Sequence, residues 1–251
     1  MARGVTCRQW LKRLLATLFW VAAWHILACV VKNPLLLPTP WRVLCRAWEL
    51  MQTAPFWQTT AASIGRILLG AVWAVVLGVL LAVACTASTL ADALVAPVMS
   101  AIQAAPVASF AILLLIWMER DFVPVLICAM MVLPVVWSNV RTGILQTDGQ
   151  LLEMARVYRL SPGQVLRRIY VPSVLPYFRA ACSSALGLGW KAGIAAEVLT
   201  VPALSIGRRI SEAKLYLLTE ELFAWTLTVV LLSLLLQTVA LRLLKGRDGR
   251  A

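Results

Sequence analysis

Long apolar runs separated by short polar segments dominate the chain. A helix that spans a membrane needs about 20 mostly apolar residues. Six stretches meet or approach this requirement, and they are 14–31, 67–91, 93–118, 122–140, 173–199 and 222–241. The fifth is the least apolar, because it contains Arg179, Lys191 and Glu197. The pattern therefore predicts an all-α integral membrane protein with six transmembrane helices.

The segments between these runs differ in kind. Residues 33–40 are rich in proline and predict an irregular cap on the first helix. Residues 41–53 predict a short helix at the outer interface, where tryptophan is favoured. Residues 119–121 predict a tight turn. The longest polar insertion is 141–172, between the fourth and fifth spans, and it carries the clearest local signals.

The first half of this insertion predicts a short amphipathic helix over 151–159. Asp148 stands just before it, and a carboxylate at that position accepts hydrogen bonds from the free N–H groups of the first turn. We therefore expect Asp148 to cap this helix.

The second half contains a capping box. Ser161 is followed by Pro162 at the first helical position and by Gln164 three residues after the serine. A second short helix is predicted from Pro162 toward Tyr170, with Pro172 ending it. The insertion is thus expected to form a helix-turn-helix on the cytoplasmic face.

Composition supports a membrane location. Of 251 residues, 61% are hydrophobic and 14% are charged, whereas soluble domains carry about 25% charged residues. The net charge of +12 does not predict nucleic-acid binding, because the basic residues lie between apolar runs without a nucleic-acid motif. Six scattered cysteines and the single His25 offer no clustered metal ligands, so we expect no metal site. No small-residue cleavage site follows the first run, and we expect no cleaved signal peptide.

The basic residues favour cytoplasmic N- and C-termini, because Lys and Arg are retained on that side. With this orientation, residues 1–13 form a cytoplasmic N-terminus, 14–244 the transmembrane domain and 245–251 a cytoplasmic tail. The cytoplasmic side then receives these basic residues: Arg3, Arg8, Lys12, Arg13, Arg141, Arg156, Arg159, Arg167, Arg168, Arg242, Lys245, Arg247 and Arg250.

The insertion also resembles a known motif. Glu153-Met154-Ala155, followed by Arg159, Ile169 and Pro172, resembles the "EAA" loop of binding-protein-dependent ABC permeases. In that pattern Glu-Ala-Ala is followed after three residues by Gly, then after nine by Ile and shortly by Pro. Met154 replaces an alanine. Arg159 replaces the glycine, which bears on the turn, since glycine takes a positive φ more readily than arginine.

Three further pieces resemble the nitrate/sulfonate/taurine-type branch of that family. Leu36-Leu37-Pro38-Thr39-Pro40 is similar to its entry after the first span. Ser63-Ile64-Gly65-Arg66 and Gly70 are similar to the start of its second span. Ala195-Ala196-Glu197 and the later Ser205-Ile206-Gly207 are similar to its fifth-span exit and outer loop. The match runs in order from Leu35 to the end of the sixth span.

The resemblance implies a permease with the type I importer fold in the plasma (inner) membrane of a prokaryote. Its partners would be a second permease copy, most simply as a homodimer, a cytoplasmic ATP-binding subunit, an extracytoplasmic solute-binding protein and membrane lipid. The implied coupling residues are Glu153, Met154, Ala155, Arg159, Ser161, Pro162, Ile169 and Pro172. The chain lacks a Gly-x-x-x-x-Gly-Lys-[Ser/Thr] loop, so ATP is expected to bind the partner subunit rather than this chain. Small anions such as nitrate, taurine or alkyl sulfonates are the implied solutes.

Charged residues within spans are functional candidates by default. Lys191 and Glu197 are six residues apart, about 240° around a helix, so they do not form a simple pair on one face. Lys191 is a candidate for attracting an anionic solute in the pathway, or for neutralising an acid on a neighbouring helix. Glu197 is a candidate pathway or gate residue, or an interfacial one. Arg66 falls near a span end and is expected to reach the interface.

Two other functions compete with the importer subunit. A standalone secondary transporter would need coupling ions and usually inverted repeats. A membrane-embedded enzyme would need clustered acidic, histidine or Ser/Lys groups at membrane depth. The sequence shows no convincing repeat, and only Lys191 and Glu197 approach such a cluster.

Overall fold

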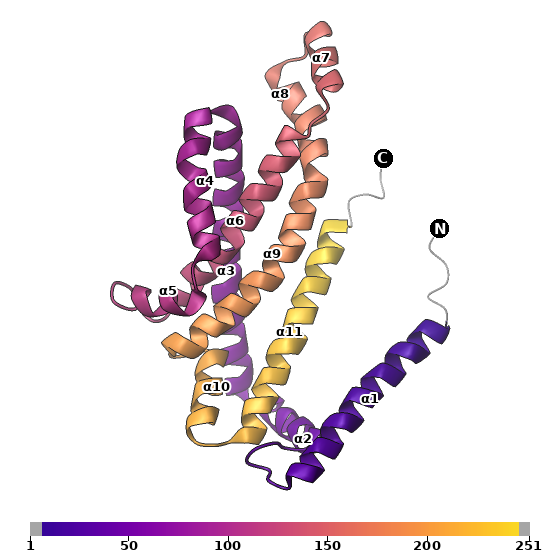
Figure 1. The fold of residues 1–251 in the computed structure, drawn as a ribbon, viewed down its shortest axis with the longest axis vertical. Helices are drawn as coiled ribbons and strands as arrows, with labels where there is room; N and C mark the ends of the chain where they lie inside the picture. The colour runs from indigo at the N-terminus through magenta and orange to yellow at the C-terminus, as the bar shows by residue number, and fades with distance from the viewer. Residues whose placement is uncertain (1–6, 246–251) are drawn as a thin grey trace. The chain divides into compact units, whose positions relative to one another are not determined.

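The computed structural model describes residues 7–245 and shows an all-helical chain within that range (Figure 1). Residues 1–6 of the expected N-terminus and residues 246–251 of the expected tail therefore lie outside the described residues. The elements are α1 Cys7–Val31, α2 Pro40–Met51, α3 Ala54–Ala87, α4 Thr89–Ala104, α5 Val107–Leu114, α6 Val123–Leu145, α7 Gly149–Val157, α8 Pro162–Val165, the π-helix η1 Leu166–Tyr170, α9 Val171–Thr200, α10 Ile206–Leu215 and α11 Thr219–Lys245.

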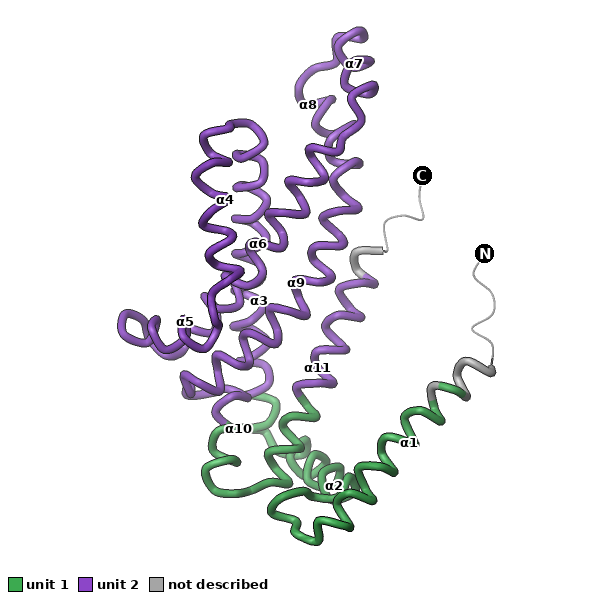
Figure 2. Tube along the Cα trace, in the orientation of Figure 1, with its two compact units in different colours: residues 1–58, 209–228 green, residues 59–208, 229–251 purple. Residues whose placement is uncertain are grey.

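The chain divides into two compact units, which Figure 2 shows in different colours. Unit 1 comprises residues 1–58 and 209–228, and unit 2 comprises residues 59–208 and 229–251. The boundaries fall inside α3, α10 and α11.

Unit 1 joins α2 to the first turns of α11 through ion pairs. The Arg46 guanidinium donates to Glu221 and to Glu49, at 2.9 Å in each case. The hydrogen bond with Glu221, supported by Glu49, raises the pKa of Arg46 above its ordinary value. Beside the ion pairs, the rings of Phe56 and Trp225 stack with centroids 5.1 Å apart. The prediction of a short helix over 41–53 is confirmed by α2.

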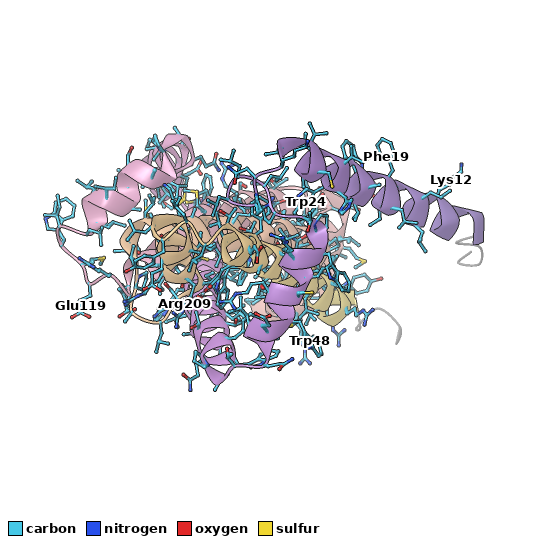
Figure 3. The ribbon with its side chains drawn as sticks, turned by 90° about the horizontal axis from the view of Figure 1, so that it is seen from below. Lys12, Phe19, Trp24, Trp48, Glu119 and Arg209 are labelled. Carbon is cyan, nitrogen blue, oxygen red and sulfur yellow. The ribbon has the colours of Figure 1, made fainter. Side chains whose placement is uncertain are left out.

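Helix α1 exposes nearly all of its apolar surface within unit 1. Phe19, labelled in Figure 3, is 65% exposed, and only 6% of the window Leu14–Val31 is buried. Since water disfavours such a surface, it suits contact with lipid.

Unit 2 has its core between α3, α6 and α9. Two glycines of α9 allow close approach, because a Cβ on Gly189 would lie 2.7 Å from Val132 Cγ2, and one on Gly193 would lie 2.7 Å from Ile67 Cγ1. Ile127 on α6 is fully buried in the same core. Helix α6 thereby packs along α9, and small residues set the spacing.

The stretch 93–118, expected to hold the third span, does not form one continuous helix. The chain breaks between α4 and α5, and the two helices meet at 101°. Pro106 explains the break, since it lacks an N–H and its ring disfavours the helical conformation at the preceding residue. Ala105 is accordingly extended, with φ −75° and ψ 132°.

Within residues 7–245, four helices are long and apolar enough to cross a membrane, or five if the bent α4–α5 pair counts as one span. They are Leu14–Val31, Ala54–Ala87, Val123–Leu145 and Thr219–Arg242. Helix α9 is not among them, because its glycines, serines and charges keep its hydropathy low. The all-helical membrane architecture is confirmed at this coarser level, and the count of six stays a prediction.

Candidate functional site

The polar insertion 141–172 folds into the two short helices predicted for it. Asp148 accepts a hydrogen bond from the Gln150 backbone N–H at 2.8 Å and so caps α7. On α7, Glu153 and Met154 are exposed, whereas Ala155 is 3% exposed. The motif therefore presents two side chains outward and places one inside the loop.

Arg159 adopts the conformation that the family's glycine would supply. Its φ is +50°. Around it, the Leu160 N–H donates to the Ala155 carbonyl at 2.9 Å and the Arg159 N–H donates to the Arg156 carbonyl at 3.1 Å. This pair of bonds is a Schellman motif, which ends a helix with a left-handed residue. The turn thus keeps its geometry although arginine replaces glycine.

The capping box at the start of α8 is confirmed. The Ser161 N–H donates to Gln164 Oε1 at 2.9 Å, and the Gln164 N–H donates to Ser161 Oγ at 3.4 Å. Pro162 occupies the start of the helix, where its missing N–H has no intrahelical acceptor to lose.

Pro172 does not end this second helix, so that prediction was wrong. Helix α8 passes through the π-helix η1 directly into α9, and Pro172 lies within the first turn of α9. The Val171 N–H bonds to the Leu166 carbonyl, five residues back. A proline near the start of a helix loses few bonds, and the π-turn is the local distortion that accompanies it.

The two ends of the motif meet inside the loop structure. Ile169 is 5% exposed and Ala155 is similarly buried, so both belong to the packing of the helix-turn-helix. Between α7 and the α8–η1 segment lies a hollow of about 500 Å³. It is lined by Leu152, Ala155, Arg156, Arg159, Leu160, Val165 and Tyr170.

The two pathway candidates on α9 have opposite surroundings. Lys191 is exposed, and among the described residues no carboxylate pairs with its ammonium group. It is the only charged residue among the exposed positions of α9, all of which the structure describes. Glu197 is 0% exposed.

Glu197 belongs to a polar cluster within unit 2. Its carboxylate accepts from Ser63 Oγ at 2.8 Å, from Arg66 Nη1 at 3.2 Å and from the Gly207 N–H at 3.2 Å. Arg66 also donates to Asp121 at 2.7 Å and to the Leu204 carbonyl at 2.6 Å.

Asp121 lies in the connection between α5 and α6, where Glu119 is directed away from the helices (Figure 3). The cluster therefore brings together α3, α9, the start of α10 and this connection.

Arg66 was expected to reach the interface, and the structure corrects this, since its side chain is 16% exposed and holds two carboxylates. The signal was present in two of the sequence motifs: 63–66 supplies Ser63 and Arg66, while 195–197 and 205–207 supply Glu197 and Gly207. Their contacts are long-range, so the motifs alone did not reveal that they meet.

A comparison with known families decides the class of protein. The model of the binding-protein-dependent transport system inner membrane component matches residues 74–249. The chain belongs to this family.

Its curated relatives are permease proteins of ABC importers. The putative aliphatic sulfonates transport permease protein SsuC of Bacillus subtilis (strain 168) is 25% identical over 217 residues, covering 86% of this chain and 78% of the relative. The taurine transport system permease protein TauC of Escherichia coli (strain K12) is 25% identical over 253 residues, covering 98% and 90%. The nitrate import permease protein NrtB of Synechococcus elongatus is 27% identical over 192 residues, covering 72% and 68%.

The resemblance to the nitrate/sulfonate/taurine branch is thereby confirmed. As a member of this family the chain is a multi-pass permease subunit of the inner membrane and a transport component rather than an enzyme. Family membership likewise implies ATP-binding and solute-binding partners.

Proposed function

We propose that this permease forms the translocation pathway for a small anion and that residues 150–172 couple it to a separate ATPase subunit. The observation that carries the proposal is the loop itself. Its motif positions Ala155 and Ile169 are buried and hold the helix-turn-helix together, while Glu153 and Met154 face outward. A loop that is folded internally and still exposes its motif residues suits recognition by a partner.

The exposed side of the loop is apolar as well as charged. Met154 is 45% exposed, Val157 79%, Tyr158 73% and Leu166 58%. These side chains lie in the polar insertion rather than in a membrane-spanning stretch. Exposed apolar side chains in a polar segment suit an interaction site, and a nucleotide-binding subunit is the partner that the family supplies.

Movement of the loop has a direct route into the membrane domain. Helices α8, η1 and α9 form an unbroken helical run from Pro162 to Thr200. At about 1.5 Å per residue the run is roughly 58 Å long, which is more than the hydrocarbon thickness of a bilayer. Displacing the loop therefore displaces this whole rod, as an alternating-access cycle requires.

Lys191 is the residue that we assign to the pathway. It lies on the exposed side of the same rod, in register with Ser184, Leu188 and Ala195. An unpaired cation there attracts an anionic solute, and charges at membrane depth are retained for function. The relatives' names, which include sulfonates, taurine and nitrate, are in keeping with such a solute.

The finer architecture completes the proposal. Six spans, with α4–α5 and α9 counted as two of them, put both termini on the same side of the membrane, and the basic residues favour the cytoplasmic side. Two copies of the chain form a homodimer embedded in lipid. A prokaryotic inner membrane is the expected location, and a solute-binding protein delivers the anion to the outer face.

A pull-down from the native membrane tests the proposal. The tagged chain, extracted in mild detergent, is expected to co-purify with a stoichiometric ATP-binding subunit, identified by mass spectrometry. Glu153→Lys should retain less of this subunit, whereas Glu119→Lys, the same charge reversal at an exposed position outside the loop, should keep it. A chain that purifies alone and moves solute in liposomes without ATP would sink the proposal.

A further inference from the structure

Glu197 is a fully buried carboxylate that the pathway does not explain, because it exposes no atom to a passing solute. We propose that Glu197 is a positioning residue, which fastens the start of α10 to α3 and α9 so that this corner of unit 2 moves as one rigid piece during transport. We call Ser63, Arg66, Glu197 and Gly207 the clasp. The inference rests on the proposed function, since it concerns which helices move when the ATPase subunit displaces the coupling loop.

The first argument is how α10 begins. The first N–H groups of a helix have no partner within it and need acceptors from elsewhere. The Ile206 N–H donates to Ser63 Oγ at 2.9 Å, the Gly207 N–H to Glu197 at 3.2 Å and the Arg208 N–H to Ser205 Oγ at 3.0 Å. Only the last acceptor is local. The other two come from α3 and α9, so α10 is capped by the helices that it packs against.

The second argument is charge. A carboxylate at the start of a helix is stabilised by the positive end of the helix dipole. The positively charged guanidinium of Arg66 forms an ion pair with the same carboxylate. Arg66 forms a second ion pair with Asp121, whose side chain is 55% exposed. A buried charge is tolerated when it is paired and its remaining acceptor sites are filled. Glu197 meets both conditions.

The third argument is the close approach of the backbones. A Cβ on Gly207 would lie 2.3 Å from the Glu197 carbonyl carbon, and one on Gly193 would lie 2.7 Å from Ile67 Cγ1. Gly193 and Glu197 are one helical turn apart on α9. The helix is therefore in direct contact with α3 and with α10 at the same level.

The fourth argument is a strained residue at the turn. Val201 has φ +50°, which is unfavourable for a β-branched side chain. Its N–H is held by the Glu197 carbonyl at 2.9 Å. Strain of this kind persists when the surroundings over-determine the conformation, and here both the carbonyl and the carboxylate of Glu197 fix the turn.

These features describe a permanent joint rather than a gate. Opening the clasp would leave the buried carboxylate of Glu197 and the N–H groups of Ile206 and Gly207 without partners. A fully satisfied network of buried polar groups rigidifies its surroundings. Because α8, η1 and α9 are continuous, the joint stands at the far end of the rod that begins at the coupling loop. A stroke at the loop is thus passed to α3 and α10 together.

Thiol labelling of the purified permease–ATPase complex tests this joint. In a chain with its six native cysteines replaced, Ile206→Cys places a thiol at a position that is 0% exposed and uses only its backbone in the clasp, and Leu204→Cys serves as the control at 48% exposure. Each is treated with a maleimide without nucleotide and again after trapping with ATP and vanadate. Cys at position 206 is expected to react at least about tenfold more slowly than at 204 in both states. Reaction at a similar rate in either state would show a gate and overturn the proposal.

A second measurement separates positioning from mere folding. Glu197→Gln is expected to retain ATP hydrolysis while solute uptake falls by about tenfold. Ser63 and Gly207 donate to one oxygen of Glu197 and Arg66 donates to the other, so an amide that keeps the first two contacts turns its NH2 group toward Arg66 and loses the charge pair. Asp121→Asn, on the exposed arm, should change uptake by less than about twofold. Unchanged uptake per ATP in Glu197→Gln contradicts the assignment. A wild-type complex that hydrolyses no ATP refutes the proposed function instead, and the contrast between positions 204 and 206 without nucleotide still measures the joint.

Discussion

The two ends of the helical rod from Pro162 to Thr200 are built in opposite ways. The end that we propose to face the cytoplasm, the inner end, carries the loop, where Glu153, Met154 and Tyr158 are exposed and Arg159 ends α7 at positive φ. At the opposite end, the outer end, Glu197 is buried and its carboxylate accepts hydrogen bonds from three donors. Both ends rely on a non-glycine residue in the left-handed region, and only the outer one is also held by buried charges.

The difference follows from what each end has to contact. Side chains that bind a partner subunit must stay exposed in the isolated permease, so their contacts contribute to binding and not to the stability of the fold. Groups that transmit force within the subunit must be satisfied inside it, because an unpaired buried polar group is costly.

Removing the carboxylate of Glu197 should have the largest effect on stability. Glu197→Ala leaves the Gly207 N–H without its acceptor and Arg66 with Asp121 as its remaining carboxylate, and breaking a buried pair costs about 3–5 kcal/mol. Thermal unfolding of the purified complex measures it. Arg46→Ala in unit 1, whose ion pairs are more exposed, should cost no more than about 1 kcal/mol. Equal losses in the two variants would remove the distinction between buried and exposed pairs.

Adding one methyl group at Gly207 should also be costly. Its Cβ would collide with the Glu197 backbone at 2.3 Å, whereas a Cβ on Gly65 meets nothing within 4 Å. Gly207→Ala is therefore expected to destabilise by about 1–3 kcal/mol or more, as overpacking does. Gly65→Ala is the matched control and should be neutral or slightly stabilising. A neutral Gly207→Ala would mean that α9 and α10 separate easily.

At the inner end, Glu153→Lys should impair function rather than folding. Glu153 is exposed, so reversing its charge should leave the thermal midpoint almost unchanged while uptake falls by about tenfold, equivalent to about 1.4 kcal/mol of lost interaction. Uptake into vesicles and unfolding are measured on the same preparation. Normal uptake would remove Glu153 from the coupling contact.

Between the two ends, Lys191→Met should weaken the attraction of an anion. The attraction between the Lys191 ammonium group and an anion a few ångströms away, in a partly polar site, is worth about 1 kcal/mol or more. Without it, the solute concentration for half-maximal uptake should rise about fivefold. Lys191→Arg should preserve it. If both variants match the wild type, Lys191 does not face the solute.

Arg159→Gly should give the smallest and most local effect, and it should be stabilising. A left-handed conformation costs an L-residue about 1–2 kcal/mol relative to glycine, part of which glycine loses in chain entropy. Hydrogen exchange at the Leu160 N–H should therefore slow several-fold. Faster exchange would show that the Arg159 side chain, which lines the hollow in the loop, contributes more than its backbone costs.

Local signals in the sequence determined much of the inner end. Asp148 and the Ser161–Gln164 box fixed the starts of α7 and α8, since a cap depends only on residues a few positions apart. Hydropathy identified the long helices. It did not predict the bend at Pro106 within an apolar run, nor the passage of the helix through Pro172, because a proline's consequence depends on the surrounding backbone bonds.

Only the tertiary structure decided the outer end. Ser63 and Glu197 are 134 residues apart, and Arg66 and Glu197 are 131 apart. Read along the chain, Arg66 and Glu197 are two charges near the ends of different spans, and each alone would be drawn to water. Folding pairs them in the protein interior at the start of a third helix. The pairing offsets the desolvation cost of the two buried charges and holds the three helices together. Sequence patterns report what a residue does to its neighbours in the chain, whereas partners so distant are set by the packing of α3, α9 and α10.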